Sequence, residues 1–289
     1  MNLLLEQIFN GITLGAFYAL VTLGLVLTFS VLKIVNFSHG DLFMVSGYTL
    51  YLLMKHTQLH YLIIVVLVIL LTALYSIIIE RLVIHPILNR PWWAHAVATL
   101  GLAIVMQNAI TWIFTTDPRQ VPTIFSSQVL EVAGIRASYQ RWLVVLVTIL
   151  VFVGLQWFVK KTKLGKTMRA VSQSAEVCKL VGIDTKKIAL ITFLIGGAIT
   201  GLAAALVAPL FNVYPQMGSM ITLKALAAII MGGMGSVNGA MYAGMLLGMV
   251  ESLFGGYVSL AYKDVAAFTF FILVLLFRPH GLFGKKIGL

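Results

Sequence analysis

Long apolar stretches separated by short polar segments dominate the chain. Runs of roughly twenty apolar residues match the hydrocarbon core of a bilayer. They predict spans near 7–29, 40–54, 61–79, 94–115, 142–159, 189–212 and 264–278, and one further apolar stretch covers 222–254. The pattern predicts an all-α, polytopic helical membrane protein with about seven or eight transmembrane helices. All 289 residues, 1–289, are assigned to a single transmembrane domain.

Basic residues are distributed unevenly between the two sides of the predicted membrane. The insert 160–188 holds eight of the twenty Lys and Arg residues. Basic residues favour the cytoplasmic side, so we place this insert inside. Alternation along the predicted spans then puts fourteen basic residues inside and five outside, with Lys224 left over. The N-terminus is expected outside and the C-terminus in the cytoplasm, and this placement argues against nucleic-acid binding as the reason for the net charge of +11.

The stretch 222–254 does not fit a single crossing, because it must begin and end on the outer side if 264–278 runs inward. Its centre, MGGMGSVNGA at 231–240, contains four glycines in ten residues. Glycine weakens a helix and permits tight turns. We therefore expect a re-entrant hairpin or broken helix with the glycines at its tip. A long tilted helix with small residues for close packing is the alternative.

Polar side chains inside apolar spans are costly and usually face a bundle interior or a cavity. Lys224 is expected to extend its ammonium group to the interface, with pairing to a carboxylate as the alternative. Each polar residue taken alone could make an interhelical hydrogen bond, but as a set they predict a polar interior. The predicted substrate-pathway residues are Asn36, His39, Thr99, Gln107, Asn108, Ser236, Asn238 and Glu251.

The sequence predicts no catalytic or metal site. The six histidines show neither an HExxH motif nor Cys/His ligand spacing. His39 and Asp41 are two residues apart, and such residues do not face each other on a helix. The GGMGS segment lacks the lysine of a phosphate-binding loop, so no cofactor is expected in this chain. Cys178, the single cysteine, excludes an internal disulfide and is expected to be a small packing residue.

The basic insert contains a pattern typical of a short helix. In SQSAEVCKLVG at 172–182, Ser172 suits the N-cap and Gly182 the C′ position. Asp184 is placed to cap the helix that continues into the sixth span. A narrow apolar stripe recurs at helical spacing: Val171, Ala175, Cys178 and Val181. From the residues alone, the segment could dock on a partner or lie on anionic headgroups.

Four stretches, in order along nearly the whole chain, carry a resemblance to a known family. They are VNFSHGDLFMVSGY at 35–48, ATLGLAIVMQN at 98–108, the segment 168–210 that begins MRAVSQSAEV, and LKALAAIIMGGMGSVNGAMYAG at 223–244. They resemble the branched-chain amino acid permeases of ABC importers, with Ser38 where alanine is usual. The length and short N-terminus are similar to the LivH-type subunit rather than the longer LivM-type subunit.

The resemblance implies a permease of the bacterial inner membrane that works by alternating access. It implies a second homologous permease (LivM type), two ATPase subunits that bind ATP and Mg, and a periplasmic or extracellular substrate-binding protein. The insert 160–188 would then be the segment that docks on the ATPase. The residues that the resemblance assigns to this contact are Arg169, Ala170, Glu176, Leu180, Gly182 and Ile183.

The substrate and the class of transporter stay open at this stage. Urea and short-amide permeases resemble the same family, and the sequence does not separate them from permeases for branched-chain amino acids. A self-sufficient secondary transporter that uses Glu251 as a coupling-ion site is a second class, and it would predict an inverted repeat. An intramembrane enzyme is a third class, which the missing motifs weaken.

Overall fold

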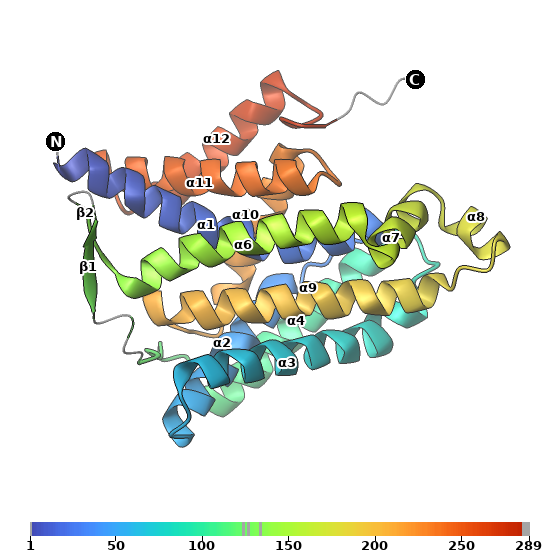
Figure 1. Cartoon of the computed structure of the whole chain (residues 1–289), viewed down its shortest axis with the longest axis horizontal. Helices are drawn as coiled ribbons and strands as arrows, with labels where there is room; N and C mark the ends of the chain where they lie inside the picture. Colours follow the sequence, from blue (N-terminus) through green and yellow to red (C-terminus); the bar gives the residue numbers. More distant parts are fainter. Residues whose placement is uncertain (1, 123–124, 126–127, 133–134, 285–289) are drawn as a thin grey trace.

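The computed structural model describes residues 2–122, 125, 128–132 and 135–284. Most helices lie along the long axis of the molecule, side by side (Figure 1). Six of the described helices are long and apolar enough to cross a membrane. The expected polytopic helical fold is therefore confirmed.

The first half of the chain supplies α1 to α4. These helices are α1 (Asn2–Leu32), α2 (His39–His56), α3 (Tyr61–Ile79) and α4 (Trp92–Phe114). A π-helical turn, η1 (Glu80–Ile84), and a 3-10 turn, η2 (His85–Ile87), extend α3.

The second half supplies α6 to α12. These elements are α6 (Tyr139–Lys161), α7 (Lys163–Gln173), α8 (Ala175–Leu180), α9 (Thr185–Val207), the 3-10 turn η3 (Ala208–Leu210), α10 (Met217–Gly232), α11 (Val237–Tyr257) and α12 (Lys263–Phe277).

The glycine-rich stretch is a hairpin of two helices, as the sequence predicts. α10 and α11 pack against each other, and the chain reverses between Gly232 and Val237. Gly233 and Gly235 in this turn have positive φ angles of 98° and 90°, which side chains with a Cβ rarely adopt. The alternative of one long tilted helix is wrong, because these two residues end α10. The described C-terminal residues return to this tip, where the Leu282 N–H donates to the Met231 carbonyl at 2.8 Å.

α1 forms the centre of the bundle, because it packs against α6, α9, α10 and α11. Small residues let the backbones of α1 and α11 come close, as in other membrane helix pairs. A Cβ added at Gly248 would meet the backbone of Gly15. This pairing holds the α10–α11 hairpin against the N-terminal helix.

A two-stranded antiparallel sheet lies at the end of the bundle where the chain begins (Figure 1). Its strands are β1 (Val129–Val132) and β2 (Ile135–Ser138), with Val129 opposite Ser138. The expectation of helices alone did not include this hairpin. α7 and α8 lie at the opposite end of the bundle (Figure 1).

The basic insert folds into two helices rather than one, so the assignment of Ser172 as N-cap is wrong. Ser172 lies inside α7, and its hydroxyl donates to the Arg169 carbonyl at 2.8 Å. The chain is extended at Ser174 (φ −156°, ψ 108°), and the Ser174 Oγ accepts the Val177 N–H at 3.3 Å. This break changes the phase of the helix. Of the predicted apolar stripe, Val171 and Cys178 are consequently buried, whereas Ala175 and Val181 are exposed.

The caps that follow α8 agree with the sequence. Gly182 has a φ of +81°, its N–H donates to the Lys179 carbonyl at 3.1 Å, and the Ile183 N–H donates to the Cys178 carbonyl at 2.9 Å. These two bonds form a Schellman motif with Gly182 at C′. The Asp184 carboxylate then accepts two backbone N–H groups of the first turn of α9, as predicted.

Candidate functional site

A partly buried cluster of charged and polar side chains joins α1, α10, α11 and α12. The Lys224 Nζ lies 2.8 Å from Glu251 Oε2 and 2.6 Å from Asp264 Oδ1. It also donates to the Tyr18 hydroxyl at 2.7 Å, and that hydroxyl donates to Glu251 Oε2 at 2.8 Å. The Lys263 Nζ lies 3.4 Å from Glu251 Oε1. We call these five residues the ionic cluster.

The expectation that Lys224 extends to the interface is wrong, and the alternative of pairing with a carboxylate is confirmed. The residue is only 7% exposed, and Glu251 is 1% exposed. An isolated charge at such burial costs several kcal/mol, and only close partners compensate it. The cluster contains two ammonium groups and two carboxylates, so their formal charges cancel.

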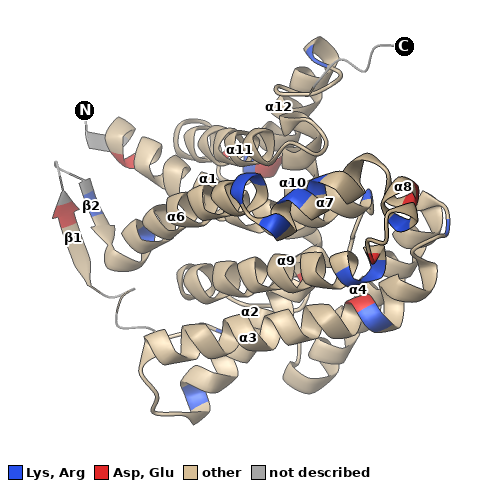
Figure 2. Cartoon of the chain, turned by 45° about the vertical axis from the view of Figure 1, so that its right-hand side comes forward, with Lys and Arg blue, Asp and Glu red and all other residues tan. Residues whose placement is uncertain are grey.

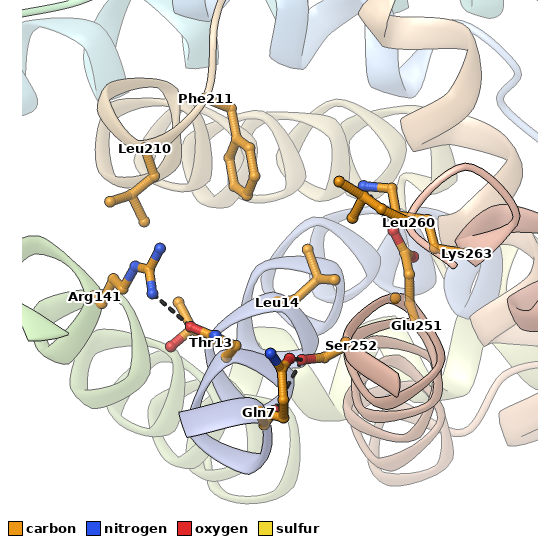
Figure 3. Close-up of a pocket in the computed structure, with 13 residues that line it drawn as sticks. Gln7, Thr13, Leu14, Arg141, Leu210, Phe211, Glu251, Ser252, Leu260 and Lys263 are labelled. Carbon is orange, nitrogen blue, oxygen red and sulfur yellow. Dashed lines mark hydrogen bonds and ion pairs between the residues drawn. The ribbon is translucent and has the colours of Figure 1, made fainter. Parts of the chain in front are cut away.

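Two cavities flank the ionic cluster. The larger, about 350 Å³, is lined by Lys224, Lys263 and Asp264 and by mostly apolar side chains: Leu14, Phe17, Phe43, Val207, Phe211, Met217, Met220 and Ile221. The smaller, about 300 Å³, includes Glu251 and more polar groups (Figure 3): Gln7, Asn10, Thr13, Arg141 and Ser252. Leu14, Phe211 and Lys263 line both cavities.

The arrangement suits a small solute with one apolar part and one ionic part. The ring of Phe211 and the side chain of Leu14 stand between Arg141 and Lys263 in the smaller cavity (Figure 3). Binding sites for small molecules are typically apolar cavities with a few convergent polar groups. The ionic cluster supplies such groups, and the aromatic and aliphatic walls supply the apolar part.

Three of the predicted pathway residues meet near the start of α2, away from these two cavities. The Asn36 Oδ1 accepts the N–H and the hydroxyl of Ser38 at 3.1 and 2.8 Å. The His39 Nε2 lies 3.2 Å from the carbonyl oxygen of Val21. The Thr99 Oγ1 accepts the Phe37 N–H at 3.2 Å. All three predicted residues are buried and are held by hydrogen bonds within the protein.

The remaining predicted residues are spread over the bundle. The Gln107 Nε2 donates to Asp41 Oδ1 and to Ser219 Oγ, both at 2.8 Å, and so joins α4 to α2 and α10. The exposed Asn108 donates to the Ile104 carbonyl within its own helix at 2.8 Å.

Two others lie in the first turn of α11. The Ser236 Oγ accepts the Gly239 N–H at 3.0 Å and caps the helix, and Asn238 contacts Gln156. Of the eight predicted residues, all within the described part of the chain, Glu251 is the one that lines a flanking cavity, the smaller of the two.

Sequence reasoning missed Tyr18 and Lys263 as partners of Glu251, and Asp264 as a second carboxylate partner of Lys224. In the sequence, nothing distinguishes Tyr18 from the other aromatic and apolar residues of the first span. Lys263 and Asp264 lie where a span begins, so they read as ordinary interface charges. The predicted hairpin could have indicated the pairing of Lys224 with Glu251, because a reversal of the chain at the glycines brings position 224 opposite position 251.

Comparisons with known proteins agree along the length of the chain. The family model described as "Branched-chain amino acid transport system / permease component" matches residues 7–276. The permease protein BraD of a high-affinity branched-chain amino acid transport system of Pseudomonas aeruginosa is 32% identical, over 97% of this chain and 96% of its own. The corresponding LivH protein of Escherichia coli K12 is 31% identical over the same shares.

Similarity extends to a more distant organism. A probable LivH permease of Methanocaldococcus jannaschii is 27% identical over 92% of this chain and 88% of its own. No solved structure matches the chain. The family match reaches every apolar span predicted from the sequence, ending within the last one, and it includes the α10–α11 hairpin and the basic insert. The chain therefore belongs to the family of permease components of branched-chain amino acid transport systems.

Proposed function

We propose that the chain is the permease subunit of an ATP-driven importer of branched-chain amino acids. The observation that carries this function is the family match over residues 7–276, together with relatives that are named as branched-chain amino acid permeases and cover 97% of the chain. The chain is then a transport subunit rather than an enzyme, and separate subunits hydrolyse ATP.

The two cavities beside the ionic cluster form part of the substrate pathway in this proposal. A branched-chain amino acid is a zwitterion with an aliphatic side chain. The larger cavity, about 350 Å³, offers aromatic and aliphatic walls for that side chain and the ionic groups of Lys224 and Asp264 for its two charges. Urea has no apolar part to fill such a cavity, so the lining favours an amino acid.

Four other predicted pathway residues are proposed to lie in the part of the bundle that rearranges during transport. Asn36, His39 and Thr99 hold the start of α2 by hydrogen bonds, and Gln107 joins α4 to α2. In alternating access, such bonds would break and re-form between outward-facing and inward-facing states. Asn108, Ser236 and Asn238 are proposed as pathway residues on the sequence pattern alone.

The end of the bundle that contains α7 and α8 is proposed to face the cytoplasm, with the N-terminus on the outer side. The positive-inside rule supports this orientation, because the charges of the insert gather there (Figure 2). In this orientation α10 leads inward to the glycine turn, α11 returns outward, and α12 leads inward again. The membrane would be the inner membrane of a bacterium.

α8 is proposed as the docking element for an ATPase subunit. Leu180 is 86% exposed, and the neighbouring Val177 and Val181 are exposed as well. An exposed apolar group rimmed by charge marks an interaction site, and the Schellman motif at Gly182 gives this one a fixed shape. The contact would include Arg169, Ala170, Glu176 and Ile183. A second permease, two ATPases and a soluble binding protein complete the proposed importer.

A pull-down tests this function directly. We would purify the tagged chain from its native membrane in mild detergent and identify the co-purifying proteins by mass. The proposal predicts ATPase subunits and a second permease. Leu180→Asp should reduce the recovered ATPase by at least about tenfold, because it puts a charge into an apolar contact.

Leu59→Asp is the matched control for this experiment. Leu59 is also an exposed leucine, but it lies in the short link between α2 and α3, and on the proposed orientation that link is on the outer side. This variant should recover the ATPase as the unaltered chain does. A chain that purifies alone and still transports when reconstituted would overturn the proposal. Equal ATPase recovery with both variants would overturn the docking role of α8.

A further inference from the structure

We propose that Arg81, Lys186 and Lys187 form a binding site for the headgroup of an anionic phospholipid. The site lies at the end of the bundle that contains α7 and α8, between the extension of α3 and the start of α9. It does not depend on which solute the protein carries. It goes beyond the proposed transport function, since it concerns the lipid that surrounds the protein.

The site is a hollow of about 490 Å³ with walls from three elements. Arg81 and His85 come from η1 and η2, and Lys186, Lys187 and Leu190 come from α9. Charged residues of η1 and of the first turn of α9 lie side by side in Figure 2. Basic pockets between transmembrane helices are typical sites for anionic lipid headgroups.

Two carboxylates also line the hollow, and one oxygen of each is held by a group of the protein. Glu80 is 0% exposed, and its Oε1 lies 3.2 Å from His85 Nδ1. The Asp184 Oδ1 accepts the backbone N–H groups of Lys186 and Lys187 at 3.0 and 3.1 Å. Among the described residues, neither carboxylate forms an ion pair with Arg81, Lys186 or Lys187, and three cations against two carboxylates leave the hollow with a net positive charge.

The three cations lack a protein counter-ion within the part of the chain that the structure describes. The ion pairs found there involve other basic residues: His85, Arg136, Lys224 and Lys263. Arg81, Lys186 and Lys187 are all exposed. An anion that enters the hollow would thus meet three unpaired positive charges, and an arginine fork suits the oxygens of a phosphate.

The surface beside the hollow favours a lipid over a free phosphate. One and two turns deeper on α3, on the face of Arg81, the exposed side chains are Ile78 and Leu74. On α9, Leu190 and the exposed Leu194 follow Lys187 at helical spacing. Residues three or four apart lie on one face of a helix. Each helix thus carries cationic side chains at this end and apolar side chains on the same face in the turns that follow. The cations suit the headgroup of a lipid, and the apolar side chains suit its acyl chains.

Native mass spectrometry of the complex purified from its membrane tests this site. Dioleoylphosphatidylglycerol and dioleoylphosphatidylcholine would be titrated separately, with inorganic phosphate as a competitor. The test variant is Arg81→Gln/Lys186→Gln/Lys187→Gln, which keeps the backbone cap at Asp184. The matched control is Lys160→Gln/Lys161→Gln/Lys166→Gln, which removes the same charge from exposed lysines outside the hollow, at the other end of the insert 160–188.

The proposal predicts selective binding of phosphatidylglycerol that inorganic phosphate does not displace. The test variant should weaken this binding at least about tenfold, and the control should change it by less than about twofold. Equal weakening by both variants would show a diffuse charge effect and overturn the site. Displacement by inorganic phosphate would assign the hollow to a free anion instead. Unchanged lipid binding with loss of a co-purifying subunit would assign it to a protein contact, again against the proposal.

Discussion

Lys224 of α10 and Glu251 of α11 form an ion pair of 2.8 Å inside the bundle, across the two arms of the glycine-centred hairpin. The Tyr18 hydroxyl of α1 bonds to both side chains. The pair therefore fixes the hairpin to the central helix as well as closing it on itself. Because it also borders the two cavities, the same contact links stability to the proposed substrate pathway.

Removal of Lys224 should destabilise the protein strongly. Lys224→Met leaves the buried Glu251 with Lys263 as its one remaining cationic partner among the described residues, and it removes the partner of Asp264. Breaking one partner of a buried pair costs about 3–5 kcal/mol of unfolding free energy. Thermal unfolding in detergent measures the loss, and Lys224→Met/Glu251→Gln should recover part of it because the orphaned charge is gone.

Arg136→Gln is the control for that series, since Arg136 pairs with Glu131 on the exposed β-hairpin at 2.8 Å. Such an exposed pair contributes about 0–1 kcal/mol. Equal effects of Lys224→Met and Arg136→Gln would contradict the structural role of the ionic cluster.

Lys263 should affect transport more than stability. Its Nζ is 3.4 Å from Glu251 Oε1, its side chain is 38% exposed, and it lines both cavities. Because the Lys263 side chain is partly solvated and Glu251 keeps its shorter pair with Lys224, the loss of Lys263 should cost only about 1 kcal/mol. Lys263→Met should therefore leave the unfolding temperature within a few degrees of the unaltered protein. Substrate uptake by the reconstituted complex should fall about tenfold or more, since one ammonium group leaves the proposed pathway.

Lys55→Met provides the comparison for uptake, because Lys55 lies at the exposed end of α2 and lines neither cavity. Uptake that is the same for Lys263→Met and Lys55→Met would remove Lys263 from the pathway.

The close approach of α1 and α11 should be sensitive to one methyl group. A Cβ at Gly248 would overlap the backbone of Gly15, whereas a Cβ at Gly101 of α4 would meet nothing within 4 Å. Gly248→Ala should lower the yield of folded protein and its unfolding temperature, because the two backbones must separate. Gly101→Ala should be neutral or stabilise the helix by about 0.5–1 kcal/mol. Size-exclusion profiles and thermal unfolding of the two variants check this, and a tolerated Gly248→Ala would contradict the packing.

Much of the fold could be predicted from the sequence because the bilayer leaves few choices. An apolar run of sufficient length must be a helix in lipid, so the spans follow from hydropathy. The parity of the crossings, together with the glycines between Met231 and Ala240, predicted the α10–α11 hairpin. Asp184 and Gly182 also took their expected places, because capping depends on local backbone geometry.

Other features depend on contacts that local patterns do not contain. Ser172 and Ser174 both suit an N-cap, and the extended backbone that selects Ser174 follows from how α7 packs against α6 and α9. The partner of Lys224 could be predicted only after the hairpin was in place. Tyr18 lies 206 positions away in the chain, and only the packing of α1 against the hairpin brings it there.

We propose that this chain carries branched-chain amino acids in partnership with ATPases. The most direct measurement is uptake of radiolabelled leucine into proteoliposomes that contain the purified complex, its soluble binding protein and ATP. We expect ATP-dependent leucine uptake that excess isoleucine or valine suppresses and excess urea does not, with no uptake by the chain alone. Uptake of urea instead of leucine, or leucine uptake by the chain alone without ATP, would contradict it.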